Sequence, residues 1–119
     1  MINRVPSENA DQYVITVLQL YLKLPETPLK ASSHDRQTAA ALYTRGISLA
    51  AIESALLLAS VRRLVRSQGL PPLSPIRSLA YFLPVIEEIL LSPVPNDYLE
   101  YLRRKMTSLS GREKLRKNA

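Results

Sequence analysis

Apolar residues recur along this chain at spacings of three and four, which is the spacing of one face of an α-helix. The clearest stripe predicts a first helix from about Glu8 to Leu24, stopped by Pro25. No segment alternates apolar and polar residues for long enough to predict a half-buried strand. The pattern therefore predicts an all-α fold, a compact bundle of about five helices.

The next two helices are marked by serines that can cap them and by a glycine between them. The second is expected over His34–Arg45, and Gly46 suits the left-handed residue after its end. Ser48 then caps a long third helix over Leu49–Gln68. This helix is apolar on most sides near its centre, so we expect it to be the buried central helix of the bundle.

A proline interrupts the fourth predicted helix. The helix begins at Ser74 or Ser78, and Pro84 follows within its apolar run. A proline inside a helix removes a backbone hydrogen bond and clashes one turn back. We therefore expect a kink near Ala80–Pro84, or two short helices.

Asn96 or Asp97 opens the fifth helix, which leads to a basic C-terminal end. Gly111 suggests that the helix stops there, so residues 1–110 are expected to form one helical domain. Residues 111–119 are then expected to be a flexible basic tail.

Composition indicates the cellular compartment of the protein and excludes some kinds of site. The chain has 119 residues and no cysteine, which excludes disulfides and zinc–thiolate sites and fits a reducing cytoplasm. No apolar run approaches the roughly 18 residues needed to span a bilayer, and the first residues lack the apolar core of a signal peptide. We expect a cytoplasmic protein without a membrane partner.

Charge is distributed unevenly along the chain. The net charge is +6, made up of −1 over residues 1–35, +5 over 36–77, −4 over 78–100 and +6 over 101–119. Two basic blocks separated by an acidic one predict a positive face, which is typical of nucleic-acid-binding proteins. The ordinary alternative is that these charges are simply solvated.

We predict that arginines and lysines of the two basic blocks contact nucleic-acid phosphates, with DNA favoured over RNA. Such contacts give affinity without sequence choice, and the affinity falls steeply with salt. The candidate residues are Arg45, Arg62, Arg63, Arg66, Arg77, Arg103, Arg104, Lys105, Arg112, Lys114, Arg116 and Lys117.

Two of these arginines need an opposing anion. Arg62 and Arg66 share a helix face one turn apart, where like charges repel each other. Either Glu87 or Glu88 lies opposite them within the fold, or a phosphate of a partner does.

Residues 38–57 resemble a helix-turn-helix. The resemblance rests on Gly46 in the turn, Ile47 and Ser48 after it, and Ile52 packing inward. It implies that the helix after the turn enters the major groove of DNA. The sequence departs from the motif at Leu42, where a small residue is usual, and at residues 56–60 (LLLAS), which continue the helix instead of turning. A plain helical hairpin explains the turn equally well.

A longer stretch is similar to the helical DnaD-type domain of phage and plasmid replisome organisers. The resemblance implies an all-helical module that binds DNA and assists helicase loading. It departs at Pro84 and lacks the tryptophan that usually closes the pattern. The matching residues are Gly46, Ile47, Ile52, Ala55, Ala59, Ile76, Ser78, Leu79, Tyr81, Phe82, Ile86 and Leu90.

Catalytic signatures are missing from the sequence. His34 beside Asp35 is more typical of a helix terminus than of a general base, and Glu87 and Glu88 are neighbours that point about 100° apart. With three glycines, one histidine and no cysteine, we expect no phosphate-binding loop, metal site or cofactor, and no enzymatic activity.

Two functions remain open at this stage. The first is a basic DNA-binding protein, an accessory factor in replication or maintenance of a mobile element, acting in a larger nucleoprotein complex or as a homo-oligomer. The second is a helical protein–protein interaction or oligomerisation module without nucleic-acid contact. In that case the third helix and the segment Pro71–Pro95 form a groove for a partner helix.

Overall fold

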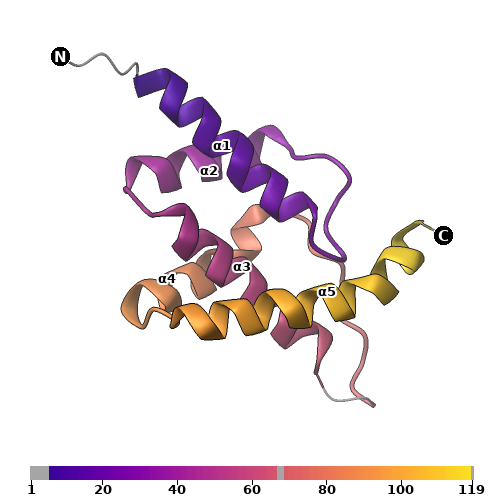
Figure 1. Cartoon of the computed structure of the whole chain (residues 1–119). Coiled ribbons are helices and arrows are strands. Elements are labelled where there is room, and N and C mark those ends of the chain that lie inside the picture. The colour runs from indigo at the N-terminus through magenta and orange to yellow at the C-terminus, as the bar shows by residue number, and fades with distance from the viewer. Residues whose placement is uncertain (1–5, 67–68, 119) are drawn as a thin grey trace.

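The computed structural model describes the backbone of residues 6–66 and 69–118 and the side chains of residues 9–66 and 69–109. Within these ranges the chain is all-helical and has no strand, as predicted. Five α-helices and one short 3-10 helix follow one another (Figure 1): α1 (Pro6–Leu22), α2 (Ser33–Thr44), α3 (Leu49–Leu64), η1 (Leu79–Phe82), α4 (Leu83–Leu91) and α5 (Asn96–Asn118).

Helix α3 is the central helix of the bundle, as its apolar sequence predicted. It contacts α1, α4, α5 and η1, while α2 packs on α1 and η1. Every side chain from residue 54 to 61 is buried. Because α3 is covered along this stretch, its middle is not available to a partner. Figure 1 shows α5 crossing α3, with its C-terminal end reaching past the other helices.

The core is built from aliphatic side chains around two aromatic rings. Tyr21 of α1 and Phe82 of η1 are fully buried and meet edge to face, with their ring centres 6.0 Å apart. Such aromatic pairs add to the stabilisation that burial of their area provides. The contact joins α1 to η1.

The predicted helix caps are present. Ser32 and Asp35 form a reciprocal capping box at the start of α2, and the Ser48 hydroxyl accepts a hydrogen bond from the Ala51 amide at the start of α3. Gly46 has a φ of 75°, the left-handed value expected after a helix end.

Pro84 divides the fourth helical segment into two short helices, one of the two predicted outcomes. It stands in the first turn of α4, directly after η1. There its missing N–H costs no helical hydrogen bond. Ser78 begins η1, with its side chain accepting from the Ala80 amide.

Helix α1 begins and ends two residues earlier than predicted, and the predicted ends of α3 and α5 differ by more. Helix α3 stops at Leu64 rather than at Gln68, and residues 67–68 lie outside the described residues. The Arg66 guanidinium, just after the end of α3, donates a 2.7 Å hydrogen bond to the Pro71 carbonyl at the start of the proline linker. Helix α5 continues through Gly111, because one glycine lowers helix stability without ending a helix.

Candidate nucleic-acid interface

Two of the predicted phosphate contacts, Arg45 and Arg62, are paired with the acidic residues of α4. Arg45 donates to both carboxylate oxygens of Glu87, and Arg62 to both oxygens of Glu88, with shortest distances of 2.6 Å. Hydrogen bonds from these guanidinium groups lower the pKa of both carboxyls. The expectation that Glu87 or Glu88 opposes Arg62 is therefore confirmed for Glu88.

Arg103 is paired in the same way on α5. Its guanidinium donates to both oxygens of Glu53 on α3, at 2.9 and 3.0 Å, and also to Glu100 one turn earlier on α5. Hydrogen bonds to these carboxylates, first to Glu53, raise the pKa of Arg103. This arginine therefore joins α5 to the central helix.

Arg63 is buried, with only 5% of its side chain exposed. It forms a 2.6 Å ion pair with Glu26, donates to the Tyr81 hydroxyl at 3.3 Å, and donates to the Ser74 carbonyl. Its guanidinium also lies over the Tyr81 ring, 5.6 Å from the ring centre. Arg63 thus connects α3 to the connector after α1 and to the linker before η1, and all three of its guanidinium nitrogens donate within the fold.

These pairs change the charge distribution that the sequence suggests. Every glutamate in residues 9–66 and 69–109 pairs with an arginine. The basic block 36–77 and the acidic block 78–100 therefore partly neutralise each other across the α3–α4 contact.

Four predicted residues keep an unbalanced charge within the described side chains. Arg77 and Arg104 are exposed, and Arg66 and Lys105 are partly exposed. None of the four forms an ion pair with a carboxylate of residues 9–66 and 69–109. The side chains of the remaining candidates lie outside the described residues: Arg112, Lys114, Arg116 and Lys117.

Positive charge is concentrated on the C-terminal part of α5. Residues 104–118 contain six basic residues and one acidic residue, a net charge of +5, whereas the rest of the chain sums to +1. Leu99, Leu102 and Met106 bury the earlier part of α5 against the bundle. The basic segment thus overlaps the last of these buried positions, Met106, and continues toward the end that projects in Figure 1.

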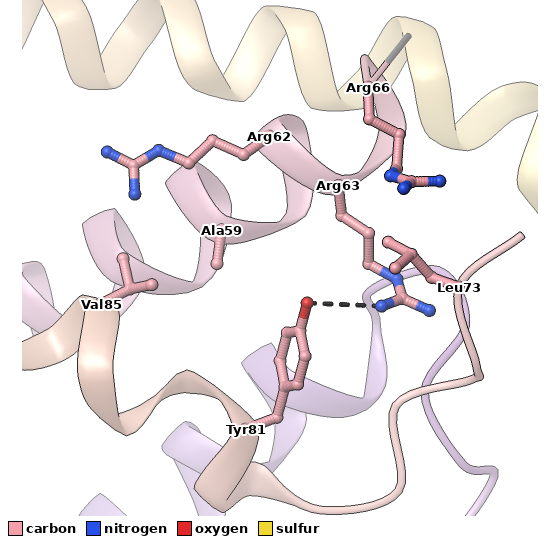
Figure 2. A pocket seen from close by; sticks show the side chains of 7 residues that line it. All are labelled: Ala59, Arg62, Arg63, Arg66, Leu73, Tyr81 and Val85. Carbon is pink, nitrogen blue, oxygen red and sulfur yellow. Dashed lines mark hydrogen bonds between the residues drawn. The ribbon is translucent and has the colours of Figure 1, made fainter. Parts of the chain in front are cut away.

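A hollow of about 280 Å³ lies beside the C-terminal end of α3. Figure 2 shows three arginines around it, Arg62, Arg63 and Arg66, together with the Tyr81 ring. Its apolar walls are Ala59, Leu73 and Val85. Sequence reasoning found the arginines but not this hollow, because Leu73, Tyr81 and Val85 carry no chemical signal of their own.

His34 and Asp35, the pair considered for catalysis, lie in the first turn of α2. Asp35 is buried: it caps α2 through the Ser32 amide and also accepts a 2.9 Å hydrogen bond from the Leu79 amide of η1. His34 beside it is exposed. In residues 9–66 and 69–109, no three His, Cys, Asp or Glu side chains gather as metal ligands would.

No protein-family model, curated protein or solved structure matches this chain. The helix-turn-helix and DnaD-type resemblances therefore stay predictions from the residues quoted above. No helix in the described part of the chain has both the length and the apolar character needed to cross a membrane. What the fold and these sites define together is an all-α bundle with one strongly basic helix.

Proposed function

We propose that this protein binds nucleic acid, DNA in preference to RNA, through the basic C-terminal part of α5, residues 104–118. The observation that carries the proposal is the net charge of +5 on residues 104–118, set against +1 for the rest of the chain. A helix rises 1.5 Å per residue, so the backbone of this 15-residue segment is about 22 Å long. Cationic side chains on such a helix contact phosphates and release counterions.

The proposed DNA interface contains fewer residues than the interface predicted from the sequence. Arg45, Arg62 and Arg103 have carboxylate partners, and Arg63 is buried. These residues therefore support the fold of the bundle in the proposal. Arg66 and Arg77 remain available beside α3 and in the linker. Binding through α5 positions the protein on the phosphate backbone without reading bases.

The biological setting is a further part of the proposal. A cytoplasmic accessory role in replication or maintenance of a mobile element rests on the resemblance of residues 46–90 to the DnaD-type domain and on the absence of cysteine.

A fluorescence anisotropy titration with labelled duplex and single-stranded DNA tests the proposal. Binding is expected at about 50 mM salt and a large loss of affinity is expected at about 200 mM salt. The variant R104Q/K105Q should weaken binding and flatten the salt dependence. Its matched control is K30Q/R36Q, which removes the same charge from the α1–α2 connector and α2. No binding at the lower salt concentration would contradict the proposal, as would equal effects of the two variants.

Exposed apolar side chains at the end of α4 and the start of α5 favour the second function, a protein–protein interaction module. Leu91 at the end of α4 is 89% exposed, and Leu90 beside it is 39% exposed. Tyr98 and Tyr101 on α5 stack with ring centres 5.7 Å apart and are 41% and 44% exposed. Single exposed apolar side chains are ordinary, but several together mark contact surfaces. A concentration-dependent solution mass that L91S abolishes would support this function, and a monomer at all concentrations would count against self-association.

A further inference from the structure

We propose that the hollow at the end of α3 binds a small organic anion, a phosphate or carboxylate group carried on a compact apolar body. This inference does not rest on nucleic-acid binding. It rests on an unbalanced guanidinium, a local excess of positive charge and an apolar wall, all at one place in the fold (Figure 2).

Arg66 supplies the first contact. A guanidinium has five N–H donors in a planar fork that matches phosphate and carboxylate groups. One nitrogen of Arg66 donates to the Pro71 carbonyl, which fixes the side chain at the edge of the hollow. No carboxylate among residues 9–66 and 69–109 forms an ion pair with it. The remaining donors are therefore available to an anion.

The neighbouring arginines make the hollow positive. Arg62 and Arg63 also line it, and their charges are balanced by Glu88 and Glu26. Three guanidinium groups against two carboxylates leave an excess of one positive charge. Arg63 cannot move toward a ligand because its donors are held by Glu26, Tyr81 and Ser74. It contributes a fixed positive field, while Arg66 contributes direct hydrogen bonds.

The rest of the wall requires an apolar group on the ligand. Ala59, Leu73 and Val85 line the hollow beside the Tyr81 ring. Leu73 and Tyr81 are 43% and 45% exposed, so a ligand would remove apolar surface from water there. The volume of about 280 Å³ lies just below the usual range for small-molecule pockets. The site therefore suits a compact molecule rather than a polymer.

Titration of the isotope-labelled protein with phenyl phosphate and with benzoate, followed by NMR chemical shifts, tests this site. Phenol and inorganic phosphate are the controls, one lacking the charge and the other the apolar body. Shifts centred on Arg66, Leu73 and Tyr81 are expected with at least one of the two aromatic anions. The comparison of phenyl phosphate with benzoate identifies the preferred anionic group. Inorganic phosphate binding as tightly as both, or no binding of either aromatic anion, would overturn the inference.

Variants locate the binding within the protein. R66Q is expected to weaken binding at least about tenfold, because hydrogen bonds to a charged group are lost. R77Q removes the same charge from an exposed arginine outside the hollow and should leave binding unchanged. L73S keeps Arg66 and should weaken binding of the aromatic anions without weakening binding of inorganic phosphate. This variant tests the site independently if R66Q disturbs the linker. Equal losses in R66Q and R77Q would show a net-charge effect and contradict the site.

Discussion

Replacing Arg63 by methionine tests whether this arginine supports the fold. Methionine keeps the apolar part of the side chain and removes the guanidinium. The change deletes the ion pair with Glu26 and the hydrogen bonds to the Tyr81 hydroxyl and the Ser74 carbonyl. These partners come from the connector after α1, from η1 and from the linker, so R63M loosens three segments at once.

The magnitude follows from the burial of the two partners. Breaking a buried ion pair by removing one member costs about 3–5 kcal/mol. Glu26 is 30% exposed and can regain some hydration, which places R63M at the lower end of this range, about 3 kcal/mol. For a chain of this size such a loss lowers the melting temperature by about 10 °C. R62M is the matched control, and its loss should be much smaller, because exposed ion pairs contribute little.

Urea and thermal unfolding followed by far-UV circular dichroism measure both variants. The double variant E26Q/R63M should lose less stability than the sum of its single variants, because glutamine leaves no unpaired charge opposite methionine. If R63M and R62M unfold at the same urea concentration, Arg63 does not hold the three segments together.

Three further predictions concern other buried or paired groups. D35A should lower the free energy of unfolding in urea by about 2–3 kcal/mol, because it removes the α2 cap and the acceptor of the Leu79 amide. H34A should stay within about 0.5 kcal/mol of the parent. Equal stabilities of the two variants would contradict this prediction. The lowered pKa values of Glu87 and Glu88 mean that their stabilisation is complete above their ordinary pKa of 4.5 and lost as the pH falls through the lowered values. In E87Q/E88Q the free energy of unfolding should therefore fall less steeply as the pH is lowered. An unchanged pH dependence would contradict a stabilising role for these two carboxylates. Burial, and then the charge of Asp35, raises the pKa of Tyr21 to about 12. The contribution of the neutral Tyr21 hydroxyl to the free energy of unfolding is therefore complete below pH 10 and decreases between pH 10 and 12. Y21F should remove this loss of stability at alkaline pH. It should not destabilise the protein at neutral pH, because the Tyr21 hydroxyl has no hydrogen-bond partner among the described residues. A marked loss of stability at neutral pH would show that the hydroxyl has a partner.

The local features of the fold were predictable because they depend on neighbouring residues. A serine before an apolar run, a glycine after one and a proline inside one each act within a single helical turn. Ser48, Gly46 and Pro84 accordingly stand where the sequence predicted a cap, a left-handed residue and a break. The end of α3 was harder to predict, because no glycine or proline stands at Leu64, where the helix ends.

The charge pairs lay largely beyond sequence reasoning. Arg45 and Glu87 are 42 residues apart, and Arg63 and Glu26 are 37 residues apart. Spacing along one helix predicts pairs within a turn or two, but pairs between helices depend on how the helices pack. Only the Arg62 partner was anticipated, because the repulsion between Arg62 and Arg66 required an anion nearby. Arg66 finds no such acid among the described residues, which is why the hollow beside it keeps an excess of positive charge.

Internal pairing also limits how DNA affinity can depend on salt. The logarithm of the binding constant falls with the logarithm of the salt concentration by about 0.9 for each duplex phosphate neutralised. Without the four internally paired arginines, the other eight predicted residues allow a slope no steeper than about −7, of which the six cations of residues 104–118 supply about −5. All twelve residues predicted from the sequence would give about −11. Exposed pairs such as Arg45–Glu87 gain little stability in water, so phosphates could compete with the glutamates for these arginines. A slope near −11 would mean that such exchange occurs and that the interface extends from α5 across α3 and α4.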